Sequence, residues 1–396
     1  MKLSPFHLLC LTGFLAIFGT TMAKNPVLPF FAESLGADAK TIGLVASLSP
    51  LAGVLVSLPA GMLSDRIGRS RLLRLSGLFF ALSPLGYLWA GSVLELALVR
   101  FIHGLATGIF MPVAMAQVAD MHDSSRGERL GLMSSVTQLG RFLAPLAGGL
   151  LLGLGGTLPG KEGFTWVYAG CLVLGAGAAF LVFRLPVETP EMRAACAKPS
   201  AALLGAVLRN RPILFGCAVE AAALFAFGTF EAFFPRHVRD AGYGPHWAGA
   251  LMAAQVLTVA LSKPLFGRLS DLKGREWQIV FGTLAMAATM FAMGQAGSLA
   301  SLGAISLALG LSLSLTLAAS SAYIADASSA QTRGTAMGLL GSIMDIGHST
   351  GPLATGMVIA VYGNVGGFFC SGMVVLAAGI VFAIHGLGFA KADRHS

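Results

Sequence analysis

Gly61-Met-Leu-Ser-Asp65-Arg-Ile-Gly68-Arg69 recurs 206 residues later as Gly267-Arg-Leu-Ser-Asp271-Leu-Lys-Gly274-Arg275. The same offset relates Ala119-Asp120 to Ala325-Asp326, and it relates Pro29 and Gly36 to Pro235 and Gly242. A repeat that spans about half of the chain predicts two structurally equivalent halves.

The composition indicates a membrane protein. Hydrophobic residues make up 55% of the 396 residues, whereas charged residues make up only 11%. A soluble chain carries about a quarter charged residues, so lipid must form part of the solvent here. The five cysteines are scattered, without a CxxC pair or ligand spacing, and the sequence predicts neither a disulfide framework nor a metal site.

Twelve apolar segments follow one another along the chain, each near the roughly 20 residues that cross a bilayer as a helix. They fall near 6–31, 41–63, 72–91, 94–116, 131–153 and 164–184, and then near 213–235, 246–268, 278–296, 299–321, 336–360 and 365–388. The predicted fold is an all-α integral membrane protein with twelve transmembrane helices in two pseudo-symmetric six-helix bundles. The bundles are 1–184 and 213–396, joined by a polar, proline-containing cytoplasmic linker at 185–212.

The positive charges predict the orientation. With the N-terminus inside, 18 of the 26 lysines and arginines fall in cytoplasmic segments, which favours both termini in the cytoplasm. Because the cations sit in short clusters between apolar runs, the net charge of +8 does not indicate a nucleic-acid partner. The first segment, Lys2 and an apolar run ending in Thr-Met-Ala, could also be a cleaved leader, but the repeat of Pro29 and Gly36 argues against that.

The repeated loop resembles the signature loop of the major facilitator superfamily, and the resemblance covers essentially the whole chain. Ser70 stands where a second basic residue is common, and Trp277 weakens the second copy. Short acidic side chains and arginines between helix ends can bind in one state and separate in another, as in a gate. A static topogenic cluster is the alternative. The predicted gating residues are Gly61, Asp65, Arg66, Gly68, Arg69, Asp120, Asp271, Gly274, Arg275 and Asp326.

Two glycine-rich segments also resemble family motifs. Residues 140–149 resemble the antiporter motif of the drug:proton antiporter families, and residues 347–356 have the same spacings. Small residues at helical spacing let helices approach closely, and proline lets a helix bend. We expect an interdomain seam, with ordinary packing glycines as the alternative; the resemblance implies export. The predicted seam residues are Gly140, Pro145, Gly148, Gly149, Gly347, Gly351, Pro352 and Gly356.

Ionisable and polar groups inside apolar spans are costly and mark functional sites by default. Arg100-Phe-Ile-His103-Gly104 resembles a family motif associated with proton movement, although an arginine snorkelling to the outer interface is the alternative. Asp345 and His348 are three residues apart and share a helix face; their repeat mates, 207 residues earlier, are Gln138 and Arg141. A fixed bridge from Asp345 to Arg141 or Lys24 is the alternative. The predicted substrate or proton pathway comprises Lys24, Arg100, Gln138, Arg141, Glu220, Glu231, Lys263, Asp345 and His348.

These patterns predict a secondary active transporter that works by alternating access without a cofactor. We expect a monomer in a bacterial inner membrane that couples proton movement to the efflux of a small amphipathic or anionic solute. Exporters of lipophilic cations typically carry an acidic group in the first span, where this chain carries Lys24. A proton-coupled importer of an organic anion or metabolite is the alternative. No Walker-type loop indicates ATP use, and no His-Glu-x-x-His or Gly-x-Ser-x-Gly motif indicates an intramembrane enzyme.

Overall fold

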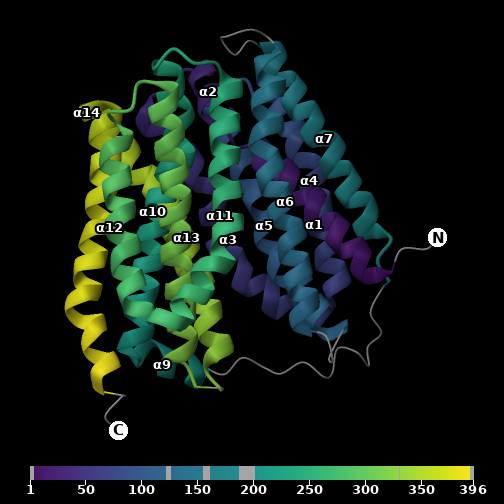
Figure 1. Ribbon diagram of the computed structural model, residues 1–396. Coiled ribbons are helices and arrows are strands. Elements are labelled where there is room, and N and C mark those ends of the chain that lie inside the picture. The colour runs from purple at the N-terminus through teal and green to yellow at the C-terminus, as the bar shows by residue number, and fades with distance from the viewer. Residues whose placement is uncertain (1–3, 122–125, 155–160, 187–200, 330, 393–396) are drawn as a thin grey trace. The chain divides into compact units, whose positions relative to one another are not determined.

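The computed structural model describes residues 4–121, 126–154, 161–186, 201–329 and 331–392. Within these ranges the chain is helical and contains no strand (Figure 1). It divides into two compact units: unit 1 holds Met1–Ala197 and Val238–Ala253, and unit 2 holds Lys198–His237 and Ala254–Ser396. The predicted boundaries at 184 and 213 are not tested by this division and stay a prediction.

Seven helices form unit 1: α1 (Pro5–Met22), α2 (Val27–Ser34), α3 (Ala39–Ile67), α4 (Arg69–Trp89), α5 (Val93–Met121), α6 (Arg126–Gly153) and α7 (Lys161–Phe183). The other helices are α9 (Ala201–Arg209), α10 (Arg211–Asp240), α11 (Pro245–Lys273), α12 (Arg275–Met293), α13 (Leu299–Asp326) and α14 (Arg333–Ala392). They belong to unit 2, except that the end of α10 and the start of α11 pack in unit 1. We call this segment, residues 238–253, the hairpin.

Nine helices in the described part of the chain are long and apolar enough to cross a membrane. The last of them, α14, has 60 residues, so it would measure about 90 Å if straight, roughly three times the hydrocarbon thickness. It breaks at Gly363, where φ is 69°, and therefore supplies two passes. The helices α6 and α12 are not among the nine.

The first predicted span is wrong in one respect, because the structure breaks it into two helices. α1 ends at Met22 and α2 begins at Val27, which leaves Lys24 and Asn25 in a turn. Pro26 lacks a backbone N–H and disfavours the helical conformation at the residue before it. Hydropathy does not register this break, because the residues on both sides are apolar.

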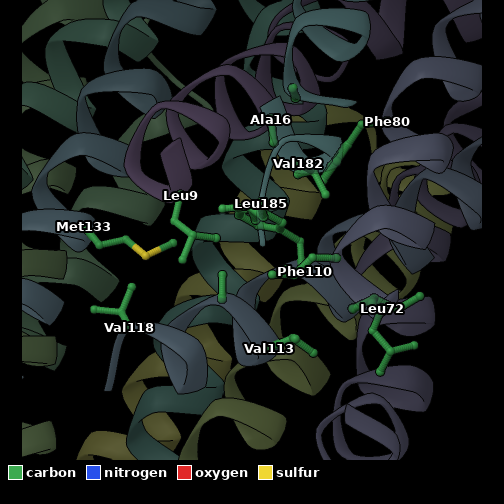
Figure 2. Packing of buried hydrophobic residues seen from close by; sticks show 14 of the residues in the cluster. Leu9, Ala16, Leu72, Phe80, Phe110, Val113, Val118, Met133, Val182 and Leu185 are labelled. Carbon is green, nitrogen blue, oxygen red and sulfur yellow. The ribbon is translucent and has the colours of Figure 1, made fainter. Parts of the chain in front are cut away.

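Unit 1 is held together by close packing of apolar side chains from α1, α4, α5, α6 and α7. Leu9, Leu72, Phe110, Met133 and Val182 are all buried, and Figure 2 shows them gathered in one cluster. Lipid tails are as apolar as leucine, so burial alone gives helices in a bilayer little reason to associate. Van der Waals contacts between well-fitted side chains supply the stabilisation.

The repeat is visible in the backbone at its turns. Gly36 and Gly242 have φ of 89° and 91°, and Gly68 and Gly274 have φ of 101° and 93°. These positive angles are readily adopted only by glycine. Each half therefore turns in the same way before its second and third long helices.

The repeat also sets one helix crossing in each half. A Cβ atom at Gly104 of α5 would lie 2.7 Å from the Cα of Ser49 in α3. At Gly310 of α13 it would lie 2.8 Å from the backbone oxygen of Gln255 in α11. Both residues of the second pair stand 206 positions after those of the first. Glycine thus allows the same close approach of two helices in both halves.

Candidate functional site

An ion pair joins the repeated loop to a neighbouring helix in each unit. Arg69, the first residue of α4, pairs with Asp120 near the end of α5 in unit 1. Arg275, the first residue of α12, pairs with Asp326 of α13 in unit 2 through Nε and Oδ2 at 2.5 Å. The left-handed glycine before each arginine starts the helix there. The two loops therefore form the same contact in the two units.

These loop pairs are suited to being broken. The side chains of Asp120 and Asp326 are 53% and 62% exposed, so water and salt screen them. Pairs of this exposure are typically worth about 0–1 kcal/mol. Arg275 has a second carboxylate within reach, because Asp271 lies 3.2 Å from its Nη2. A weak contact that can be exchanged favours interpreting these pairs as part of a gate rather than as a permanent structural contact.

Other predicted loop residues make less definite contacts. A Cβ atom at Gly61 or Gly267 would meet no heavy atom within 4 Å. Neither glycine therefore supports a close helix approach in the described part of the structure. Arg66 is exposed. The side chain of Asp65 lies outside what the structure describes.

A buried carboxylate and an imidazole form an acid–base pair in unit 2. Nε2 of His348, in α14, lies 2.6 Å from Oε2 of Glu231, in α10. Their side chains are only 18% and 10% exposed. The ring of Phe227, one turn before Glu231, lies beside the imidazole at 5.7 Å between ring centroids. A single proton can be shared between the two groups.

The sequence places His348 and Asp345 on one helix face, and the structure adds a contact of His348 with a residue of another helix. Asp345 lies one turn earlier on α14 and is half-buried, but the hydrogen bond of the imidazole goes to Glu231 on another helix. The repeat mates of Asp345 and His348 also differ in exposure, since Gln138 is half-buried and Arg141 is exposed.

Glu220 forms a second buried acidic site in unit 2. Its side chain has no exposed surface, and its Oε1 accepts hydrogen bonds of 2.7 Å from the hydroxyls of Ser320 and Ser321 in α13. Its Oε2 has no hydrogen-bond partner among the described residues. Lys263 of α11 is exposed.

Arg100 lies at the centre of a polar cluster inside unit 1. It is 1% exposed, so the alternative of an arginine snorkelling to the interface is wrong. Its Nη1 donates to the hydroxyl of Tyr87 at 3.4 Å. His103 lies between that hydroxyl, 3.2 Å from its Nδ1, and the hydroxyl of Thr20, 3.0 Å from its Nε2. A buried cation is thus surrounded by neutral polar groups.

Most glycines of the predicted seam pack helices within one unit. A Cβ atom at Gly140 would lie 3.0 Å from the backbone oxygen of Phe14, and one at Gly148 would lie 3.0 Å from that of Asn25. In unit 2, Gly347 and Gly351 lie against the backbone of α10 at Ala221 and Phe225. The described contacts of these four glycines are with the first helix segments of their own half. Their role at a seam stays a prediction.

The structure adds hydroxyl residues that the sequence did not single out: Thr20, Tyr87, Ser320 and Ser321. Each of them hydrogen-bonds to a predicted ionisable group or to its neighbour in a motif. Serines and threonines are common in membrane helices, where they often bond to their own backbone. No single residue of this kind therefore carries a sequence signal.

Lys24, a residue of the predicted pathway, lies half-buried in the turn between α1 and α2.

The sequence profile of the Major Facilitator Superfamily matches residues 9–252 and 233–389. The chain belongs to this superfamily. The transporter is 28% identical over 405 residues to multidrug resistance protein MdtG of Klebsiella pneumoniae, which covers 98% of this chain and 94% of that protein. It is 25% identical over 400 residues to the staphyloferrin B transporter of Staphylococcus aureus, covering 97% and 91%. The crystal structure of the nucleoside transporter NupG has the same fold, with a TM-score of 0.80 at 14% identity over 96% of this chain and 99% of that chain.

Membership settles the architecture. The transporter has twelve transmembrane helices in two six-helix bundles, as predicted, with α1 and α2 forming one span and α14 forming two. It is a multi-pass membrane transporter. The acid–base pair, the buried carboxylate and the loop ion pairs are thus features of a transport protein.

Proposed function

We propose that the protein exports a small amphipathic or anionic solute in exchange for protons, by alternating access. The observation that carries the proposal is the largely buried pair of Glu231 and His348, with 2.6 Å between Nε2 and Oε2. Ionisable groups inside membrane helices are costly and are retained for function. Imidazole and carboxylate can both change protonation state in an accessible pH range.

The pair can carry one proton per cycle. With the proton bound, His348 is an imidazolium beside the carboxylate of Glu231, and the pair has no net charge. When the proton leaves, the imidazole is neutral and the pair carries one negative charge. Moving a net charge through the low-dielectric core is unfavourable. The protonated and deprotonated pairs therefore give different populations of the inward-open and outward-open conformations. Proton binding on one side and release on the other can thereby drive transport.

The relatives support the direction and the type of solute. One full-length relative is named a multidrug resistance protein and another a staphyloferrin B transporter. The predicted pathway holds more cations than carboxylates. The cations are Lys24, Arg100, Arg141 and Lys263, and the carboxylates are Glu220, Glu231 and Asp345. This balance favours an anionic or neutral amphipathic solute over a lipophilic cation. Proton-coupled import of an organic anion is the second candidate, supported by the same cations.

The test is substrate-dependent proton movement in sealed liposomes that contain the purified transporter and an internal pH dye. Lipophilic drugs and organic anions are added one at a time to wild type, Glu231→Gln, Asp345→Asn and the surface control Glu162→Gln. We expect proton flux with at least one solute, and its loss in Glu231→Gln. Flux retained in Glu231→Gln and lost in Asp345→Asn would transfer the proton site to Asp345. Transport without proton flux would contradict the coupling, and the direction of solute movement separates export from import.

We also propose that the transporter is a monomer in the inner membrane with both termini in the cytoplasm. The distribution of its cations supports this orientation. A green fluorescent protein fused after Ser396 should fluoresce if the C-terminus is cytoplasmic. The fluorescent reporter folds in the cytoplasm but folds poorly when it is exported in an unfolded form. A periplasmic phosphatase at the same position should be inactive. The opposite pair of results would reverse the topology.

A further inference from the structure

The hairpin of residues 238–253 belongs to the second repeat along the chain but packs in unit 1. An ion pair fastens it there. Arg239 binds Glu33 at the end of α2 with both guanidinium arms, one of which places Nη2 3.2 Å from Oε1. The guanidinium also lies over the ring of Phe30, 5.6 Å from its centroid. This two-armed geometry is the strong form of an arginine–carboxylate contact.

The two partners stand at equivalent positions of the repeat. Glu33 and Arg239 are 206 residues apart, and each precedes by three positions a left-handed glycine, Gly36 or Gly242. The turn is therefore the same in both halves, while the charge at this position is opposite. The repeat thus presents complementary charges at matching places, at the end of the helices opposite to the 61–69 loop.

The backbone of the hairpin also lies close to the backbone of α6. A Cβ atom at Gly149 of α6 would lie 3.0 Å from the Cα of Gly249 and 2.8 Å from the backbone oxygen of Pro245 in the hairpin. One turn further along α6, a Cβ atom at Gly153 would lie 3.7 Å from the ring nitrogen Nδ1 of His246. These contacts bring the backbone of the hairpin directly against α6. The ion pair adds a charged interaction to them.

We propose that Glu33 and Arg239 form an outer latch, which holds the hairpin on the N-terminal half and opens when the outer side opens. This inference rests on the proposed alternating access, but not on protons or on the direction of transport. The side chains of Arg239 and Glu33 are 27% and 21% exposed. Water can therefore compete for them, and a pair of this exposure biases an equilibrium by about fivefold. That bias favours the closed state without trapping the transporter in it.

The test measures exposure of the surface that the hairpin covers. In full-length protein with its five cysteines replaced, Gly153→Cys introduces a thiol at ordinary contact distance from His246. A membrane-impermeant maleimide is applied from outside to intact cells or right-side-out vesicles. We expect Glu33→Gln and Arg239→Gln each to raise the labelling rate about fivefold. The double variant should label no faster than either single variant, because all three lack the same bond.

The controls separate the latch from a general effect of charge. Asp38→Asn removes one negative charge near the same turn while keeping a residue that caps α3 equally well, and it should not change the labelling rate. Exchanging the charges, Glu33→Arg with Arg239→Glu, should restore slow labelling; Asp240→Asn is added so that two carboxylates are not adjacent. Equal labelling in wild type and both single variants would overturn the proposal, as would an Asp38→Asn effect of the same size. Labelling needs no substrate and no proton gradient, so a failure of the proposed coupling would not alter it.

Discussion

At the scale of single residues, Glu220 poses an electrostatic problem, since one carboxylate oxygen is satisfied and the other is not. Two serine hydroxyls donate to Oε1, whereas Oε2 lacks a hydrogen-bond partner among the described residues. An ionised carboxylate without full hydrogen bonding is costly to bury. A neutral side chain that keeps one acceptor oxygen for the two serines would therefore be accommodated at lower cost.

This expectation makes Glu220→Gln a mild change. The glutamine oxygen can accept the bonds from Ser320 and Ser321, so the melting temperature in detergent should stay within a few degrees of wild type. Replacing both serines by alanine should destabilise the protein more, by about 2 kcal/mol, because the acid then loses both donors. If Glu220→Gln is instead the more harmful change, Glu220 is ionised and its attraction to Lys263 matters more than the serines.

Sequence reasoning found the ionisable residues of the site but not their partners. Glu231, His348 and Arg100 were identified because charge is rare in apolar segments. The pairing of His348 with Glu231 depends on how α14 and α10 are rotated against each other, which the periodicity of one helix does not contain. The same limit hid the bond between Arg100 and Tyr87, since aromatic residues in a membrane helix are usually packing residues.

At the scale of helices, glycines differ sharply in what they contribute, although the sequence shows them as one residue type. Gly310 lies against the backbone of α11. A Cβ atom at Gly310 would lie 2.8 Å from the backbone oxygen of Gln255. Gly338 in α14 faces open space. Backbone cannot rotate out of the way as a side chain can, so the two positions should respond in opposite directions.

We expect Gly310→Ala to destabilise the transporter by about 1–3 kcal/mol through overpacking. Gly338→Ala should be neutral, or stabilising by up to about 1 kcal/mol, because alanine favours helix over glycine. Melting temperatures of the purified proteins in one detergent decide between them. An equal drop in both variants would show that helix propensity or flexibility, and not the crossing of α13 with α11, controls stability at these sites.

Helix boundaries show where hydropathy fails as a predictor. The break between α1 and α2 lies inside one apolar stretch, and only Pro26 signals it. In the second half the equivalent position is Ala232, and α10 continues without interruption to Asp240. Equivalent helices thus differ in continuity here because only the first copy carries a proline at this position.

At the scale of the whole molecule, the repeat predicted the two bundles because both halves keep the same turns and crossings. It did not predict the packing of the hairpin in unit 1. The repeat shows that Glu33 and Arg239 occupy equivalent positions in the two halves. It does not show that these two residues contact each other, as they do in the structure. Such contacts between equivalent positions depend on how two copies associate, and that is not contained in either copy.

The loop ion pairs allow a gate to be distinguished from a topogenic cluster. A topogenic cluster acts through its number of positive charges, so Arg69→Gln and the neighbouring Arg71→Gln should impair the protein equally. A gate acts through one specific bond, so only Arg69→Gln should slow transport, since Arg69 pairs with Asp120 and Arg71 is exposed. The initial rate of solute transport in liposomes, corrected for the amount of inserted protein, measures this difference.

Exchanging the partners strengthens the distinction. Arg69→Asp with Asp120→Arg keeps the net charge, and we expect it to recover most of the rate lost in Arg69→Gln. Arg275→Gln breaks the equivalent bond in unit 2, and the two bonds share no partner. Their effects on the free energy should therefore add, so that Arg69→Gln with Arg275→Gln slows transport by the product of the two single factors. A double variant no slower than the worse single variant would mean that one loop alone controls the transport rate. A harmful Arg71→Gln would favour the topogenic role.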